Sequence, residues 1–183
     1  MNAQERPASW THALPYALIA AGALLRVVPH PANFAPVGAI ALFGGAVLPR
    51  RWALAVPLAV LVLSDAVLGF YPGMIWVYGS FAVIALIGMA LRRGRTLLRV
   101  AGAAVASSVI FFIITNFGEW FGPLYPHTAA GLWADYLAAV PFFRNTLVSD
   151  LLYTLAFFGI YDGAMRLAHQ QTGDRSSTLH RTT

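Results

Sequence analysis

The stretch IWVYGSFAVIALIGMALR at residues 75–92 holds no charged side chain before Arg92. A second stretch, VAGAAVASSVIFFIITNF at residues 100–117, holds none at all. A helix that crosses the hydrocarbon core of a bilayer needs roughly 20 apolar residues, with a range of about 17–25. Both stretches meet that length, so the sequence predicts two membrane-spanning helices here.

The composition of the whole chain agrees with a membrane location. Of its 183 residues, 58% are hydrophobic and 10% are charged, whereas about a quarter of the residues in a soluble domain are charged. So few charged side chains cannot cover the surface of a soluble protein of this size. We therefore predict an all-α integral membrane protein with a single domain.

Four further apolar stretches, at residues 13–28, 35–48, 52–70 and 146–165, complete a predicted bundle of six transmembrane helices. Stretch 35–48 reaches only about 21 Å as a helix, so it is either a short helix enclosed by protein or a broken, re-entrant segment. The first stretch could also be a signal peptide, with Arg6 before it and Ala21-Gly22-Ala23 as a cleavage site. The five stretches that follow favour a retained first helix.

The positions of the arginines predict the orientation, because loops rich in arginine stay in the cytoplasm. With six crossings, one face receives the arginines at positions 6, 50, 51, 92, 93, 95, 99, 166, 175 and 181. The opposite face receives Arg26 and Arg144. We therefore expect a multi-pass protein of the bacterial cytoplasmic (inner) membrane with both termini in the cytoplasm. Its parts are a tail at 1–12, a transmembrane domain at 13–168 with an outer loop at 118–145, and a polar tail at 169–183.

Aromatic and polar side chains gather on the predicted outer face. The aromatic candidates for ligand contact are Phe34, Tyr71, Trp76, Tyr78, Trp120, Tyr125 and Trp133, and the polar candidates are Asn33, Asp65, Asn116, His127, Asn145 and Asp150. Polar groups at membrane depth usually face a bundle interior or a cavity, and ligand sites combine apolar walls with a few polar groups. The alternatives are interface anchoring for the aromatic residues and pairing of Asp65 or Asp150 with Arg26 or Arg144. His30, beside Pro31, is a weaker candidate for ligand contact.

Small residues recur at fourfold spacing in the first stretch, at Ala13, Ala17 and Ala21. This spacing places them on one helical face and permits the close approach of another helix. The face could serve internal packing or a partner subunit.

Several function classes are excluded or left without support by the sequence. The absence of cysteine excludes disulfides, thiol catalysis and cysteine-based zinc sites. No nucleotide-binding, hydrolase or paired metal-ligand motif is present, and we expect neither an intrinsic cofactor or metal nor a nucleic-acid partner. Two alternatives to a binding and transport protein stay open: a small intramembrane enzyme using Asp65, Asp150 and His127, and a structural subunit of a larger membrane complex.

Several stretches carry a resemblance to a known group of proteins: RVVPHPANFAPVGAIALFGGA (26–46), LSDAVLGF (63–70), VYGSF (77–81), FFIITNFGEW (111–120), LYPHTAAGL (124–132) and PFFRNTLVSDLLYTLAFFG (141–159). They resemble a bacterial membrane family related to the substrate-binding S components of energy-coupling-factor (ECF) transporters. The nearest functional relatives within that group are the solitary vitamin B12 transporters of the BtuM type.

The resemblance implies a six-helix bundle that binds a vitamin, most readily cobalamin or another corrinoid, near its outer face. It also implies transport either alone or with an energising module made of a membrane subunit and separate ATPases. Residues Ala13, Ala17 and Ala21 would then face that module.

One position departs from the BtuM-type pattern. A cysteine that coordinates the cobalt of cobalamin in those proteins corresponds here to Ser80. A serine hydroxyl is a poorer cobalt ligand than a thiolate, so we expect no thiol-dependent removal of cyanide from cobalamin. If a corrinoid binds, Ser80 or His127 would be the residue near its cobalt.

Overall fold

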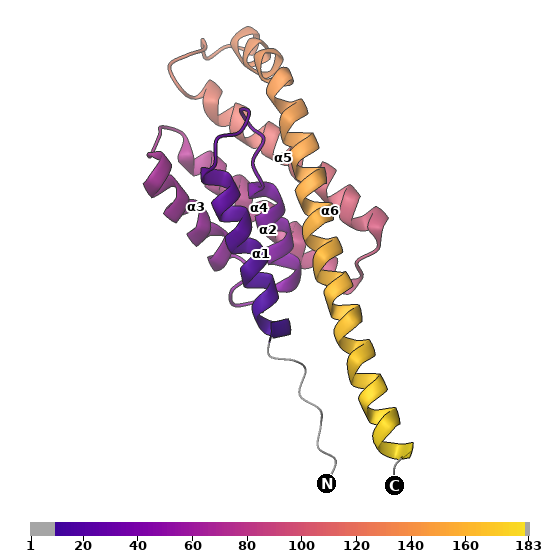
Figure 1. The fold of residues 1–183 in the computed structure, drawn as a ribbon. Coiled ribbons are helices and arrows are strands. Elements are labelled where there is room, and N and C mark those ends of the chain that lie inside the picture. Colours follow the sequence, from indigo (N-terminus) through magenta and orange to yellow (C-terminus); the bar gives the residue numbers. More distant parts are fainter. Residues whose placement is uncertain (1–9, 182–183) are drawn as a thin grey trace.

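The computed structural model describes residues 10–181, with the backbone alone described for residues 171–181. Within this range the chain forms six α-helices, one 3-10 turn and no strand. The helices are α1 (Trp10–Val27), α2 (Val37–Val47), α3 (Ala55–Leu68), α4 (Met74–Ala90), α5 (Leu97–Trp120) and α6 (Ala129–Arg181), and the 3-10 turn η1 (Leu91–Arg93) follows α4. The all-helical class predicted from the sequence is confirmed, and every predicted apolar stretch overlaps a helix (Figure 1).

Helix α2 lies at the centre of the bundle. Each of its residues from Val37 to Ala46 is buried, and α2 contacts each of the other five α-helices. Its composition of alanine, glycine and aliphatic residues permits this burial because it brings no polar side chain into the core. Of the two alternatives predicted for the stretch 35–48, the structure therefore shows the short helix enclosed by protein. This helix is about 16 Å long.

Glycines allow α2 to approach α4 closely. A Cβ atom at Gly45 would overlap the carbonyl oxygen of Ala85, and one at Gly88 would overlap that of Leu42. The two backbones therefore touch at two successive points. Such small-residue contacts maximise van der Waals packing between helices.

The buried C-terminus of α2 is capped by an arginine from η1. Arg92 donates from Nε to the carbonyl oxygen of Gly45 at 2.9 Å, and from Nη2 to the same oxygen at 2.7 Å and to that of Leu48. Carbonyl groups in the last turn of a helix have no partner within the helix. Arg92 supplies that partner and places a positive charge at the negative end of the helix dipole.

The region expected to be an outer loop, 118–145, is mostly helical. Helix α5 continues to Trp120 and α6 begins at Ala129, so residues 121–128 alone connect them. The hydroxyl of Thr128 accepts a hydrogen bond from the N–H of Gly131 at 3.1 Å, which caps the start of α6. Alanine-rich sequence then favours the helix, and Pro141 lies within it. The expected tail at 169–183 is likewise helical as far as Arg181.

The described ends of the chain lie at the same end of the bundle, which we call the terminal end (Figure 1). The loops at 28–36 and 121–128 lie at the opposite end, the loop end. Of the expected N-terminal tail 1–12, residues 1–9, including Arg6, lie outside the described residues, as do residues 182–183. The side chains of Arg175 and Arg181 also lie outside the described part of the chain.

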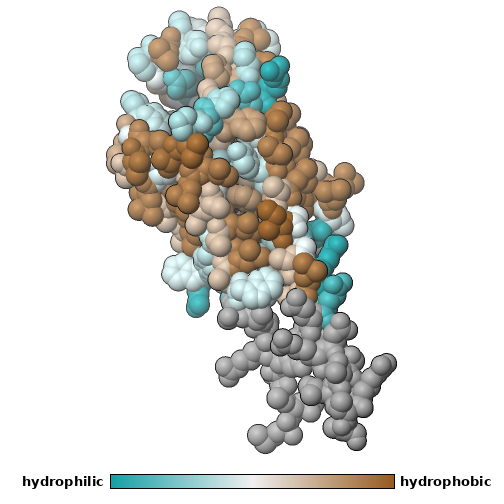
Figure 2. Space-filling view, in the orientation of Figure 1, coloured by the Kyte–Doolittle hydropathy of each residue, from teal (hydrophilic) through white to brown (hydrophobic). Residues whose placement is uncertain are grey.

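The outer surface of the bundle is apolar over much of its length, as the brown atoms in Figure 2 show. Exposed side chains include Leu63 on α3, Ile75 on α4 and Leu98 on α5. Among the described residues, two helical segments are long and apolar enough to cross a membrane, Met74–Arg93 and Leu97–Trp120. Helices α2 and α3 are apolar but shorter.

The contact between α2 and α4 gives a test of the fold. Replacing Gly88 with alanine forces a Cβ atom against the carbonyl oxygen of Leu42, and we expect a loss of about 1–3 kcal/mol of stability from overpacking. Gly79→Ala is the matched control, because Gly79 lies in the same helix and no atom lies within 4 Å of its Cβ position. It measures the gain in helix propensity from alanine without the overlap. Thermal unfolding of the purified variants in detergent measures the difference. Equal midpoints for the two variants would contradict the close contact.

Candidate functional site

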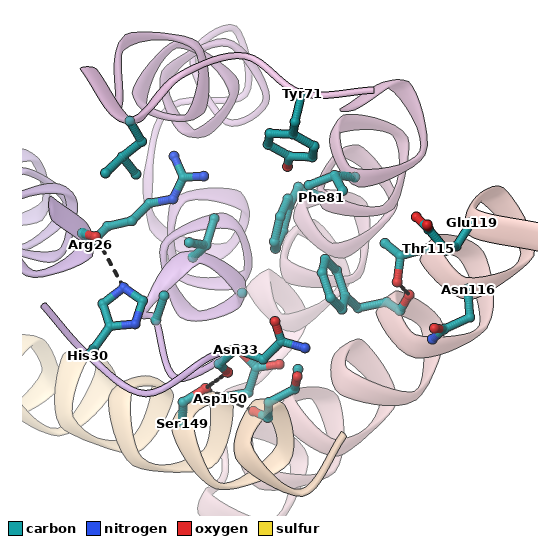
Figure 3. Close-up of a pocket in the computed structure, with 17 residues that line it drawn as sticks. Arg26, His30, Asn33, Tyr71, Phe81, Thr115, Asn116, Glu119, Ser149 and Asp150 are labelled. Atoms are coloured by element: carbon teal, nitrogen blue, oxygen red, sulfur yellow. Dashed lines mark hydrogen bonds between the residues drawn. The ribbon is translucent and has the colours of Figure 1, made fainter. Parts of the chain in front are cut away.

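A cavity of about 450 Å³ opens at the loop end of the bundle (Figure 3). Ligand pockets for small molecules commonly span about 300–1,000 Å³, so this cavity has the size of a binding site. Its walls come from α1, the loops 28–36 and 69–73, and helices α2 to α6. The lining residues are Arg26, His30, Asn33, Ala35, Val37, Gly38, Leu68, Tyr71, Val77, Phe81, Phe111, Thr115, Asn116, Glu119, Thr146, Ser149 and Asp150.

Arg26 enters one wall of the cavity already paired with a carboxylate. Its Nη2 lies 2.6 Å from Oδ1 of Asp65, and its Nη1 donates to the hydroxyl of Ser64. The hydroxyl of Tyr78 donates to Oδ2 of Asp65 at 2.8 Å. Both oxygens of Asp65 thus have partners, and Asp65 takes the structural role that was one of its two predicted alternatives.

Tyr71, from the loop between α3 and α4, lines the cavity on the same side as Arg26 (Figure 3). Burial raises the pKa of the Tyr71 hydroxyl, and the negative charge of Asp65 adds to the shift. The group therefore stays protonated at neutral pH and can donate a hydrogen bond.

Asp150, on α6, forms the buried polar floor of the cavity. Its side chain is 3% exposed, and its Oδ2 accepts a hydrogen bond of 2.7 Å from the hydroxyl of Ser108. A Cβ atom at Gly38 would overlap Oδ1 of Asp150, so glycine is needed there for the carboxylate to rest against the first turn of α2. No arginine pairs with Asp150 among the described residues.

The loop 28–36 lies beside the cavity and is tied to α6. Asn145 donates from Nδ2 to the carbonyl oxygen of Ala32 at 2.9 Å. The Oγ of Ser149 lies 3.5 Å from the carbonyl oxygen of Asn33. Asn33 has a φ of 59°, a left-handed conformation that asparagine tolerates better than most residues. His30 contacts the end of α1, with its Nε2 3.1 Å from the carbonyl oxygen of Arg26.

The apolar wall of the cavity is formed by Phe81 of α4 and Phe111 of α5, whose ring centroids lie 5.1 Å apart. Thr115 and Asn116 follow on α5, and the Asn116 Nδ2 donates to the oxygen of Phe112 at 2.7 Å. Both residues also line a smaller adjoining cavity of about 90 Å³. The site thus combines an apolar face with several hydrogen-bonding groups.

A separate aromatic cluster occupies the junction of α4, α5 and the loop 121–128. Trp76 stacks on Phe121 at 5.8 Å with an interplanar angle of 14° and leaves no room for a Cβ atom at Gly118. Trp120 donates from Nε1 to the oxygen of Pro126 at 3.0 Å and packs edge-on against His127. These candidate residues pack on one another and do not line the cavity.

The remaining candidates are dispersed. Phe34 packs against Tyr153 of α6 with centroids 6.0 Å apart, Tyr125 is half-buried in the loop 121–128, and Trp133 is exposed. Ser80 is fully buried, and its hydroxyl donates to the oxygen of Val77 at 2.7 Å. Because neither Ser80 nor His127 lines the cavity, neither is placed to ligate the cobalt of a corrinoid bound in it.

Of the residues selected from the sequence, the cavity brings together Asn33, Tyr71, Asn116 and Asp150, with the weaker candidate His30. Sequence reasoning did not select Thr115, Glu119, Thr146 and Ser149, although helical spacing could have found them. Thr115 and Glu119 lie four residues apart on α5, and Thr146, Ser149 and Asp150 lie at i, i+3 and i+4 on α6. Residues with these spacings share one helical face.

Ala13, Ala17 and Ala21 are exposed along α1. No group of three or more histidine, cysteine or acidic residues placed to hold a metal occurs in the part of the chain that the structure describes.

Asp135, near the start of α6, is a third buried carboxylate, after Asp65 and Asp150. It is 3% exposed, and its Oδ2 has no hydrogen-bond partner among the described residues. Burial raises its pKa above the ordinary value, and the negative charge of Glu119 raises it further. The folded state therefore favours the neutral, protonated form of Asp135.

The chain belongs to a family described as a family of unknown function (DUF6580), whose match covers residues 7–172. No curated protein and no solved structure matches the chain.

The raised pKa of Asp135 predicts a pH-dependent stability. A carboxyl whose pKa is higher in the folded state loses stability as the pH rises through that folded pKa. We expect Asp135→Asn to raise the unfolding temperature at pH 7 and to have a smaller effect at pH 3, below the ordinary carboxyl pKa of about 3.9, where the carboxyl is neutral in the folded and unfolded states. Asp162→Asn, which breaks the exposed pair with Arg95, is the control and should give no gain at pH 7. A stability difference for Asp135→Asn that did not change with pH would contradict this interpretation.

Proposed function

We propose that this member of the DUF6580 family is a membrane-embedded receptor that takes up a small molecule, in the manner of the S components of ECF transporters. The observation that carries the proposal is the cavity of about 450 Å³ at the loop end, lined by all six α-helices and the loops 28–36 and 69–73. Its wall joins the Phe81–Phe111 face to polar groups from α1, α5 and α6, which is the composition of a ligand site.

A membrane location supports the same function. The segments Met74–Arg93 and Leu97–Trp120 have the length and apolarity to cross a bilayer, and exposed apolar side chains continue around the other helices. Arginines 92, 93, 95 and 99 lie near the terminal end of the bundle. Loops rich in arginine stay in the cytoplasm, so this distribution favours a cytoplasmic terminal end. We propose six alternating helices with both termini in the cytoplasm, so that the cavity opens outward. The short helix α2 is enclosed by protein and needs no lipid contact.

The volume of the cavity favours a ligand the size of a small vitamin. A volume of about 450 Å³ falls in the lower half of the range for small-molecule pockets. A corrinoid with its macrocycle and side chains is much larger, so cobalamin could enter only if the loop 28–36 moved outward. That movement would break the hydrogen bond between Asn145 and Ala32. We therefore place smaller vitamins ahead of cobalamin and keep both in the test.

The exposed face of α1 with Ala13, Ala17 and Ala21 is the surface that we propose for an energising membrane partner. Small side chains there allow a second helix to approach α1 closely. If the protein acts alone, this face contacts lipid.

The topology can be tested with single cysteines, because the natural chain contains none. We expect a membrane-impermeant maleimide to label Leu124→Cys, in the loop 121–128, on intact cells. It should label Arg93→Cys, in η1, only after the cells are permeabilised. The parent chain without cysteine gives the background. Labelling of both positions from the same side would contradict the proposed orientation.

Ligand binding can be tested by calorimetry on the detergent-purified protein with a panel of water-soluble vitamins that includes cobalamin and cobinamide. We expect at least one dissociation constant below about 1 μM, equivalent to about −8 kcal/mol. Thr115→Trp, which fills the cavity from α5, should weaken that binding at least about tenfold. Ala106→Trp, on the exposed side of the same helix, is the matched control and should bind normally. If nothing in the panel binds, or if Thr115→Trp binds as tightly as the natural protein, the receptor proposal fails.

A further inference from the structure

The charges in the cavity wall are unequally compensated. Arg26 is neutralised by Asp65 at 2.6 Å and gives further hydrogen bonds to Ser64 and to the carbonyl oxygen of Leu61. Its positive charge is therefore already paired within the protein. Glu119 also lines the cavity, and the described residues offer it no ion-pair partner.

Asp150 is the buried carboxylate of this wall that has no counter-charge among the described residues. It is 3% exposed, and the hydroxyl of Ser108 is its one hydrogen-bond donor among the described residues. The residue lines the cavity (Figure 3), and its Oδ1 has no hydrogen-bond donor among the described residues. A buried charge with so few partners is costly, and a positive group of a ligand would supply the missing counter-charge.

The first turn of α2 explains how the carboxylate is held there. Asp150 rests against Gly38, and no side chain caps the N-terminus of α2. The positive end of a helix dipole stabilises a negative charge in this position. Asp150 thereby occupies the place where an anionic ligand group would otherwise bind, which disfavours an anionic ligand at the cavity floor.

The loop end as a whole carries more negative than positive charge. Arg26 and Arg144 are the arginines of this end within the described chain, and its carboxylates are Asp65, Glu119 and Asp150, whereas burial favours the neutral form of Asp135. A surface of one sign raises the local concentration of ligands of the opposite sign and speeds their association. The opposite, terminal end is rich in arginine.

We propose that the cavity takes a small organic cation, an ammonium or charged nitrogen group on an apolar body, with the Asp150 carboxylate as its counter-charge. This inference rests on the proposed receptor function and specifies its substrate class. The apolar body lies against Phe81 and Phe111, whose ring faces also attract a positive charge. Glu119, in the last turn of α5, adds negative charge to the cavity wall.

The test compares three probes with one indole body on the purified natural protein: tryptamine, which is cationic, 3-ethylindole, which is neutral, and indole-3-propionate, which is anionic. A charge-assisted contact predicts that tryptamine binds at least about tenfold more tightly than the other two in calorimetric titrations. This comparison needs no variant, so it holds even if changes at Asp150 impair folding.

A variant then assigns the preference to Asp150. Asp150→Asn should reduce the affinity for tryptamine by about tenfold and leave that for 3-ethylindole unchanged. Asp162→Asn, at the terminal end, is the control and should bind all three probes as the natural protein does. Tryptamine binding no tighter than the neutral or anionic probe, or an unchanged preference in Asp150→Asn, would overturn the inference. If no probe binds while a vitamin of the panel does, the cation class is wrong and the receptor function stands. If neither panel nor probes bind, both fail.

Discussion

The backbone of α2 lies directly against that of α4, at Gly45 beside Ala85 and at Gly88 beside Leu42. Burying a helix on every side is possible because its internal hydrogen bonds satisfy most of its own polar groups. The unpaired groups are left at its two ends. Arg92 binds the carbonyl oxygens at the C-terminal end. The N-terminal end faces the cavity, where the Asp150 carboxylate lies against Gly38. The same packing that encloses α2 thus sets the polar floor of the candidate site.

The bundle also separates groups with structural roles from groups that are open to a ligand. Asp65 and Asp150 are both buried carboxylates near the loop end, yet their surroundings differ. Asp65 receives a guanidinium and a tyrosine hydroxyl, which together satisfy both of its oxygens. Asp150 receives one serine hydroxyl. Breaking a buried ion pair is strongly destabilising, so the Arg26–Asp65 pair is a fixed part of the wall. Asp150 retains the capacity for a further partner.

Particular residues show what the sequence could and could not predict. Long uncharged runs identified the helices, and the Arg26–Asp65 pair was one of two stated alternatives. The rotation of α4 could not be inferred, because an apolar helix lacks the polar stripe that distinguishes its faces. Ser80 was selected from the family resemblance, but it is buried with its hydroxyl bonded to the helix backbone, whereas its neighbour Phe81 lines the cavity. The start of α6 was predicted as part of the outer loop 118–145, although the Thr128 cap and the alanines that follow favour a helix. The self-packed cluster around Trp76 depends on Gly118, a long-range contact with no local signature.

The position of the cavity connects the fold to the uptake that we propose. A receptor that releases its ligand toward the cytoplasm must disturb the outer wall of its site without unfolding the core. Here the core is held at the terminal end by Arg92 and along α2 and α4 by glycine contacts. The loop 28–36 is instead held to α6 by a few single hydrogen bonds, such as Asn145 to Ala32 and Ser149 to Asn33. Each such bond contributes only about 0.5–1.5 kcal/mol, far less than the burial of α2. The loop 28–36 is therefore the part of the site that can open at the lowest energetic cost, while the Asp150 floor stays fixed to α2.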